Sequence, residues 1–315
     1  MRGRLFTCDH RVYDLPRLLE WSVVHTGGVP CDSYSVTFLF DREQMPYLEK
    51  AAGFMGIENG RIVCRGIVDE YTVELGADGM TATLSGRGAA ARLLDNESRP
   101  VTYENATLAE IIRCHVTPYG IVTREIADVR ADSVFTAAAG ISQWKVLSDF
   151  CRTYGGFLPR FAANGAMLAV PEKDSGKRLV INDDSPVLSC TLREDHYGVL
   201  TEALVIDKKN NTSYSVKNPE MIAKGGQCRR VVYTPGQSTW AAMRYTGEYQ
   251  IQQSRREEKE ITVTLPGAFL AWPGDRVALD LKRMGLTGIF RVAETENLCS
   301  ARGGMTVTLT LKEVA

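Results

Sequence analysis

Hydrophobic and polar residues alternate over much of the first ninety residues, which is the pattern of half-buried β-strands. Val36, Phe38 and Phe40 share one face of a strand expected at residues 35–40. Asn59-Gly60 and Asp78-Gly79 have the composition of hairpin turns. Further strands are expected around these turns at residues 61–68, 70–75 and 80–85. Short strands at this spacing predict a small barrel or sandwich.

The middle of the chain changes to the helical period. Apolar residues recur at intervals of three and four in residues 107–116 and again in residues 142–154. Ser142 has the side chain of a helix N-cap, and Gly155-Gly156 ends the second helix. A hairpin is expected around Asn164-Gly165. Together these features predict a small α/β module, or two of them.

Strand patterns return from about residue 195 and continue to the C-terminus. Strands are expected at residues 200–207, 213–216, 230–233, 260–265, 275–281, 288–295 and 305–312. Between them, residues 238–256 have the spacing of a helix, with Trp240 and Met243 on one face. Gly247 is unfavourable within that helix.

Two segments at the ends of the two β regions repeat each other. The first reads Gly66-Ile67-Val68, followed by Gly79-Met80-Thr81-Ala82-Thr83-Leu84-Ser85. The second reads Gly288-Ile289-Phe290, followed by Gly304-Met305-Thr306-Val307-Thr308-Leu309-Thr310 after a connection three residues longer. Two matches in the same order predict a repeated fold.

We therefore expect a mixed, mainly β protein in which two related small β-barrel, tube-like domains flank an α+β insertion. The first barrel domain is expected at residues 1–95 and the α/β insertion module at 96–190. The second barrel domain is expected at 191–315, with an inserted helical segment around 238–256. Three copies of such a chain could close a ring of six similar units, because closed symmetry is the usual arrangement of homo-oligomers.

Composition and charge narrow the possible functions. A chain of 315 residues can hold two or three hydrophobic cores. The net charge of −1 provides no overall field that would recruit nucleic acid or an anionic membrane. No run approaches ~18 apolar residues, and the N-terminus lacks the apolar region of a signal peptide, so neither a membrane span nor secretion is expected.

No catalytic, cofactor-binding or metal-binding residues are expected. The histidines are widely spaced and match no metal motif; they are His10, His25, His115 and His196. The eight cysteines contain no CxxC pair and are expected to be reduced. The paired acids Asp183-Asp184 and Glu194-Asp195 are expected in turns, because adjacent strand residues point to opposite faces of a sheet.

Two further motifs need a structural interpretation. Gly86-Arg87-Gly88-Ala89-Ala90-Ala91 fits a loose dinucleotide-binding pattern. The strand before it has one polar face, unlike the apolar central strands of dinucleotide-binding sheets, so these glycines are expected to allow close packing. Trp272, before Pro273-Gly274, is a candidate for an exposed subunit contact. The mixed charges of residues 255–260 indicate a solvated face.

Short motifs in a fixed order resemble the phage tail baseplate hub family. This family includes the Mu-type hub, the late-control D proteins and the hubs of prophage-derived contractile particles. The motifs are Ser85-Gly86-Arg87-Gly88 running into Leu93-Leu94-Asp95, Tyr154-Gly155-Gly156-Phe157-Leu158, and Trp272-Pro273-Gly274-Asp275-Arg276-Val277. The resemblance extends from about residue 30 to the end of the chain.

The resemblance implies a structural, non-enzymatic protein of a contractile phage tail or phage-like particle, assembled in the bacterial cytoplasm. It implies a homotrimeric, pseudo-sixfold ring that joins the hexameric tail tube to the trimeric spike, contacts other baseplate proteins and at most lets DNA pass. One alternative is a peptidoglycan-active or carbohydrate-binding tail component. Another is a nucleotide-dependent enzyme that would use Gly86–Ala91.

Overall fold

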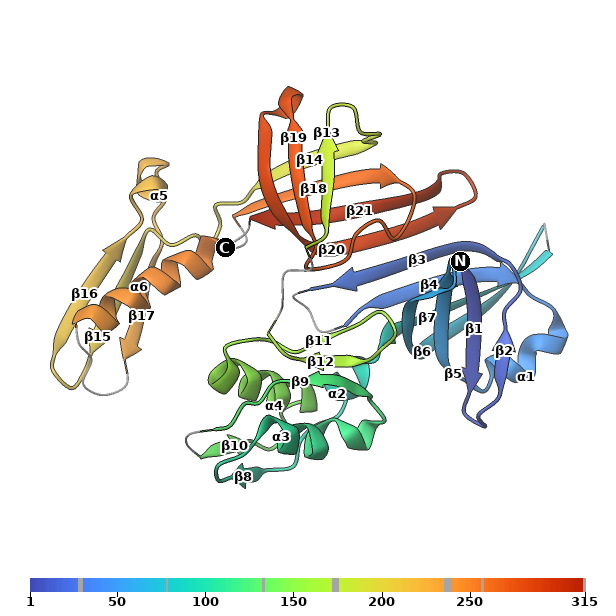
Figure 1. Ribbon diagram of the computed structural model, residues 1–315, viewed down its shortest axis with the longest axis horizontal. Helices are drawn as coiled ribbons and strands as arrows, with labels where there is room; N and C mark the ends of the chain where they lie inside the picture. Colours follow the sequence, from blue (N-terminus) through green and yellow to red (C-terminus); the bar gives the residue numbers. More distant parts are fainter. Residues whose placement is uncertain are drawn as a thin grey trace.

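The computed structural model describes residues 1–27, 31–77, 79–131, 134–171, 176–234, 240–255 and 258–313. The protein is mainly β with several sheets, which confirms the predicted fold class. Two β-rich halves lie one above the other in Figure 1, the N-terminal half in blue and the C-terminal half in red. A green α/β lobe lies against them, and a small gold unit projects to the left.

The N-terminal half is built around one hydrophobic core, in which Phe38, Phe54 and Leu84 are fully buried. Alternate positions of each strand face this core, as the hydrophobic pattern predicts. The strands are β1 (Arg2–Thr7), β2 (Val12–Asp14), β3 (Leu18–Thr26), β4 (Ser33–Leu39), β5 (Ala51–Glu58), β6 (Arg61–Gly76) and β7 (Gly79–Gly88). A 3-10 turn (Arg42–Gln44) and α1 (Met45–Leu48) connect β4 to β5.

The C-terminal half has its own core, which includes Ile261, Val263, Val277 and Leu309. Its strands are β13 (Arg178–Asn182), β14 (Ser189–Glu194), β18 (Lys259–Pro266), β19 (Arg276–Leu281), β20 (Leu286–Ser300) and β21 (Gly304–Glu313). A 3-10 turn (Lys282–Met284) joins β19 to β20. The strands β13 and β14 begin before residue 191 and pair with β19 and β18, respectively.

The two halves share one sheet. β20 pairs antiparallel with β3, so the strand order is β14-β18-β21-β20-β3-β4-β7-β6-β5-β1-β2. Within the described residues no closed barrel forms, and the two expected barrels are therefore corrected to open, curved sheets. In the C-terminal half the two end strands do not pair with each other within the described residues, since β13 pairs with β19 and β14 pairs with β18.

The α/β lobe is organised by two capped helices. The hydroxyls of Thr107 and Ser142 accept hydrogen bonds from the backbone N–H groups of Glu110 (3.2 Å) and Lys145 (3.1 Å). Its elements are α2 (Ala91–Leu94), β8 (Val101–Tyr103), α3 (Leu108–His115), a 3-10 turn (Thr117–Tyr119), β9 (Thr123–Ile126), β10 (Phe135–Ala137), α4 (Gln143–Phe150), a π-helical turn (Cys151–Gly155), β11 (Arg160–Phe161) and β12 (Met167–Ala169). Both predicted helices are present in this lobe.

The projecting unit is a small sheet covered by one helix. It contains β15 (Glu202–Asp207), β16 (Thr212–Lys217), α5 (Pro219–Ala223), β17 (Arg229–Thr234) and α6 (Trp240–Arg255). α6 confirms the predicted helix over its described part, while residues 238, 239 and 256 lie outside the described residues. A Cβ atom at Gly247 would lie 2.5 Å from Cγ2 of Val216, so this glycine lets α6 pack closely on the sheet.

Candidate functional site

Two strand runs in the shared sheet are copies of each other. In the described part of the sheet, one run is β3-β4-β7-β6 and the other is β14-β18-β21-β20. A hydrogen bond of 2.9 Å joins the hydroxyls of Thr37 and Thr83, and its counterpart of 3.1 Å joins those of Thr264 and Thr308. Both bonds connect the middle two strands of a run at the same register position.

The long outer strand of each run also has a β-bulge at the same position. The pairing of β6 with β7 shifts between Val68 and Glu70, and that of β20 with β21 shifts between Val292 and Glu294. Glu70 and Glu294 then lie opposite equivalent residues of the two repeated Gly-Met-Thr segments. A bulge inserts one residue and bends the strand, so both copies bend at the same place. These registers confirm the repeated fold.

The first part of the repeat requires a correction of two residues. When the bulges are aligned, Val68 corresponds to Val292, and Gly66 corresponds to Phe290 rather than to Gly288. The two glycines serve different purposes. A Cβ atom at Gly66 would clash with the carbonyl group of Arg87, whereas Gly288 has a φ of 148°.

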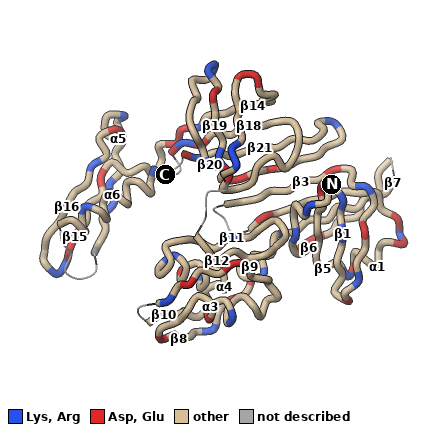
Figure 2. The backbone as a smooth tube through the Cα atoms, in the orientation of Figure 1, with Lys and Arg blue, Asp and Glu red and all other residues tan. Residues whose placement is uncertain are grey.

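One face of both runs carries mainly Ser, Thr and Glu side chains. The polar residues of this face are Ser22, Ser35, Thr37, Glu70, Thr72, Glu74, Thr81, Thr83 and Ser85 in the first run, and Thr191, Glu260, Thr262, Thr264, Glu294, Glu296, Thr306, Thr308 and Thr310 in the second. The same face also holds the basic residues Arg87, Arg193, Arg291 and Lys312 and the apolar residues Val24, Leu39 and Leu298. Burial, and then the nearby carboxylates of Glu296 and Glu260, raise the pKa of Glu294, while Lys312 opposes this shift. Elsewhere positive and negative residues are interspersed over the molecule (Figure 2).

The β20–β3 junction buries polar groups between the two halves. Asn297 is fully buried, and its carboxamide oxygen accepts a hydrogen bond of 2.6 Å from the backbone N–H of Phe269. His25 is buried beside it, with Nε2 at 2.7 Å from the carbonyl oxygen of Val63. Burial lowers the pKa of His25, an effect that Asp32 partly opposes. Sequence reasoning missed this junction, although polar residues at inward positions of an alternating strand were a usable signal.

Trp272 packs against one side of this junction. Its ring lies 4.6 Å from the ring of His25 and stacks on Phe269 at 6.0 Å. Trp272 is half-buried and lines a cavity of about 330 Å³ together with Arg160 and Arg291. The expected role of Trp272 as a subunit contact stays a prediction.

The structure gives Gly86–Ala91 a packing role. Gly86 lies in β7, where a Cβ atom would clash with the carbonyl oxygen of Ile67, and the helix that follows has only four residues. Arg87 forms ion pairs of 2.8 Å with Asp69, the extra residue of the bulge, and with Asp95, which follows α2. Hydrogen bonding to Arg87 lowers the pKa of Asp95.

The remaining chemically active residues have local partners. His115 lies between Gln143 and Tyr103, with Nδ1 at 2.6 Å from the Gln143 amide oxygen and Nε2 at 2.8 Å from the tyrosine hydroxyl. Asp184 lies in a turn and donates its backbone N–H to Asn182. Among the described residues, no three His, Cys, Asp or Glu side chains are arranged to hold a metal ion. No described helix is long and apolar enough to cross a membrane.

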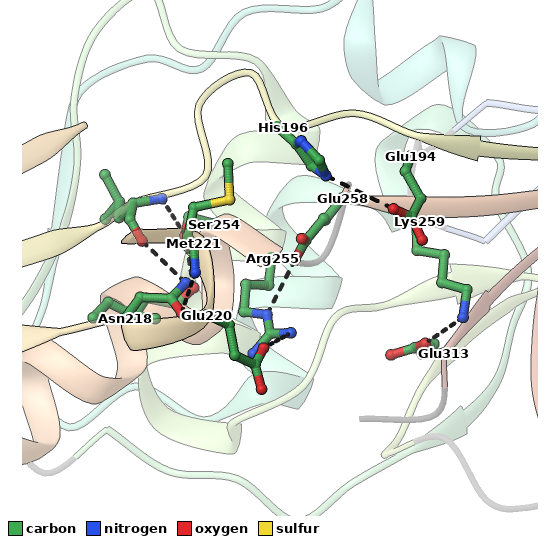
Figure 3. A network of polar contacts seen from close by, with 12 residues as sticks. Glu194, His196, Asn218, Glu220, Met221, Ser254, Arg255, Glu258, Lys259 and Glu313 are labelled. Carbon is green, nitrogen blue, oxygen red and sulfur yellow. Dashed lines mark hydrogen bonds and ion pairs between the residues drawn. The ribbon is translucent and has the colours of Figure 1, made fainter. Parts of the chain in front are cut away.

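A polar network connects the projecting unit to the C-terminal half (Figure 3). Arg255 at the end of α6 pairs with Glu220 at 2.8 Å and with Glu258 at 3.1 Å. His196 lies 3.7 Å from Glu194. Glu194 was expected in a turn, but it is the last residue of strand β14, where it pairs with Lys259 of β18. Of the charged string 255–260, residues 256 and 257 lie outside the described residues.

The fold is that of phage and prophage tail proteins. The tail protein of Neisseria meningitidis MC58 matches with a TM-score of 0.79 and 17% identity, over 99% of this chain and 96% of that one. The 43 kDa tail protein of prophage MuSo2 from Shewanella oneidensis matches with a TM-score of 0.78 and 16% identity, over 99% and 97% of the two chains. No family model matches the chain.

The sequence comparison gives a more specific match than the fold. The baseplate hub protein gp44 of Escherichia phage Mu is 34% identical to this chain over 79 residues. The aligned stretch covers 24% of this chain and 21% of gp44. The predicted resemblance to the phage tail baseplate hub family is thus confirmed, and the chain is a homologue of gp44 over that stretch.

Proposed function

We propose that this chain is a structural baseplate hub protein of a contractile phage tail or phage-like particle, in which three copies form a ring. The observation that supports this most directly is the pair of equivalent strand runs joined side by side through β20 and β3. Three such chains offer six similar units, so one ring can match a sixfold partner and a threefold partner at once.

In this proposal the ring joins the hexameric tail tube to the trimeric spike. Its partners are further copies of the chain, the tube protein, the spike protein and other baseplate proteins. The polypeptide itself has a structural role and no catalytic one. The named homologues support this assignment, since they are tail and baseplate hub proteins.

The Ser, Thr and Glu face of the two strand runs would line the channel of this ring. A basic wall would hold DNA phosphates by counterion release, and this binding would oppose passage. Carboxylates, including those of Glu294 and Glu296, repel phosphate, and the neutral hydroxyl groups carry no charge that would hold it. Of the basic residues on this face, Arg87 is paired with Asp69 and Asp95, and Arg193 is paired with Asp195. This face therefore suits a conduit through which DNA passes without being retained.

Light scattering of the purified chain over a range of concentrations, combined with negative-stain images, tests the ring. We expect the mass to approach that of three chains as concentration rises, with particles of pseudo-sixfold outline. A chain that stays monomeric at the highest accessible concentration would contradict the proposal.

A further inference from the structure

The two equivalent strand runs differ in how their edge strands are paired. In the first run the edge strand β3 is covered by the second part of β20. The edge strand of the other run, β14, pairs with β18 alone within the described residues. Likewise the second part of β6, from Glu70 onward, pairs there only with β7. Each run therefore has one open edge, and the two edges lie at opposite ends of β14-β18-β21-β20-β3-β4-β7-β6.

We propose that β14 of one protomer pairs antiparallel with the second part of β6 of the next protomer, and that this contact repeats the β3–β20 junction. This inference rests on the proposed ring and specifies its subunit interface. The β3–β20 register, transferred to the equivalent strands, predicts six opposite pairs: Glu70 with Asp195, Tyr71 with Glu194, Thr72 with Arg193, Val73 with Leu192, Glu74 with Thr191, and Leu75 with Cys190.

The burial of equivalent residues supports this register. On the core side of the β3–β20 junction, Val23 and Asn297 are both 0% exposed. Their counterparts at the open edges are Leu192, which is 37% exposed, and Val73. Leu75, at the end of the β6 edge, is 82% exposed. Apolar side chains that face the core side of a sheet and remain exposed indicate that another surface covers them in the assembly.

All the predicted pairs except one are chemically compatible. The exception is Glu70 opposite Asp195, just beyond the end of β14, where Arg193 pairs with Asp195 at 2.7 Å within the chain. On the core side, Val73 meets Leu192 and Leu75 meets Cys190, and apolar cross-strand pairs of this kind stabilise sheets. On the polar face, Arg193 lies opposite Thr72 and diagonally between two glutamates of β6. A shift of one residue would place the apolar side chains of one strand on the polar face of the other.

The proposed contact would also cover two exposed strand edges. Unpaired edges readily recruit further strands, and proteins normally cover or disrupt them. A contact between two different edges of the same chain is heterologous, and such contacts close into rings when the rotation allows. Each protomer would then add both strand runs to one continuous sheet around the channel.

A single cysteine substitution tests the register, because the chain already provides the partner thiol. In Leu75→Cys the new thiol would lie opposite Cys190 of the neighbouring protomer, at the Cβ separation of directly opposite residues. Mild oxidation of the assembled variant should give covalently linked chains, and adding Cys190→Ser should abolish the linkage. Glu74→Cys is the matched control, because its side chain is one residue away and on the other face, so it should remain unlinked.

A second variant tests whether this edge holds the ring together. Leu192→Asp places a charge in the proposed contact at a position already exposed in the single chain, so the chain should fold with an unchanged circular dichroism spectrum but scatter light as a monomer. Val180→Asp is the control, because Val180 is 59% exposed on β13 outside the two runs; its ring should persist.

The outcomes separate this inference from the proposed function. If the unmodified chain forms a ring but Leu75→Cys remains unlinked, or Glu74→Cys links equally well, the edge pairing is wrong and the hub assignment stands. If the ring forms but survives Leu192→Asp, the edge pairing is likewise wrong. If the unmodified chain never assembles, the hub proposal fails and the edge pairing fails with it.

Discussion

At the scale of single residues, Arg87 illustrates how one side chain fixes the shape of the first strand run. It connects the bulge residue Asp69 to Asp95, where the α/β lobe begins. We expect Arg87→Ala to lower the free energy of unfolding by about 1 kcal/mol at neutral pH, because a two-carboxylate network exceeds a typical surface pair. Arg113→Ala, which removes a single looser pair with Glu110 at 3.7 Å, should change it little.

The pH dependence of this effect follows from the lowered pKa of Asp95. A carboxyl group with a depressed folded-state pKa contributes stability above its unfolded pKa and loses it as pH falls through the folded value. The difference in the free energy of unfolding between Arg87→Ala and the unmodified chain should therefore become smaller when urea unfolding is repeated at acidic pH. A difference that stays constant down to pH 3 would show that Arg87 acts through packing instead.

Gly86 is a second residue whose role is steric. Because Gly86 has no Cβ atom, there is room for the carbonyl oxygen of Ile67 and for the hydroxyl group of Tyr34. A Cβ atom at this position would lie 2.6 Å from the Tyr34 hydroxyl oxygen. Gly86→Ala should cost about 1–3 kcal/mol of unfolding free energy, since backbone on a neighbouring strand cannot move away easily. In Gly76→Ala the nearest atom would lie at 3.8 Å, so urea unfolding of this control should change by less than about 0.5 kcal/mol.

At the scale of elements, local pattern predicted the helices and most strands but not how the strands pair. The N-cap at Ser142 and the Gly-Gly end correctly bounded the second helix, because both signals act within a few residues. The assignment of residues 200–207 to a barrel strand missed that β15 joins β16 and β17 in a separate sheet. The division at residues 95 and 190 stays a prediction.

The β20–β3 junction was beyond local pattern, because it joins residues more than 260 positions apart. Its buried Asn297 offers a test. Asn297→Ala leaves the Phe269 backbone N–H without its partner and should cost about 1–3 kcal/mol, with faster hydrogen exchange in β3 and β20. Leu298→Ala changes the more exposed neighbour on the opposite face and should have little effect on exchange. Equal effects of the two would show that the junction does not depend on this amide.

At the scale of the whole molecule, the arrangement of the strand runs matters more than any individual side chain. The chain shares its fold with the Neisseria tail protein over 99% of its length at only 17% identity. Fold alone does not define function, so the polar face and the open edges carry the functional argument. Sequence reasoning identified the repeat and the resemblance to the hub family, whereas the polar face became visible only once the strand register placed residues of eight strands together.

The polar face provides the last prediction, because its chemistry distinguishes the inside of a ring from its outside. Thr83→Lys with Thr308→Lys adds two positive charges per chain at equivalent positions. If this face lines the channel, the assembled variant should retain linear duplex DNA at low salt and release it as salt rises. It should not retain covalently closed circular DNA, because a closed circle cannot thread a preformed ring. Gel-shift measurements of both substrates, with the unmodified ring as control, decide the point: equal retention of circles and linear duplexes would place the threonines outside.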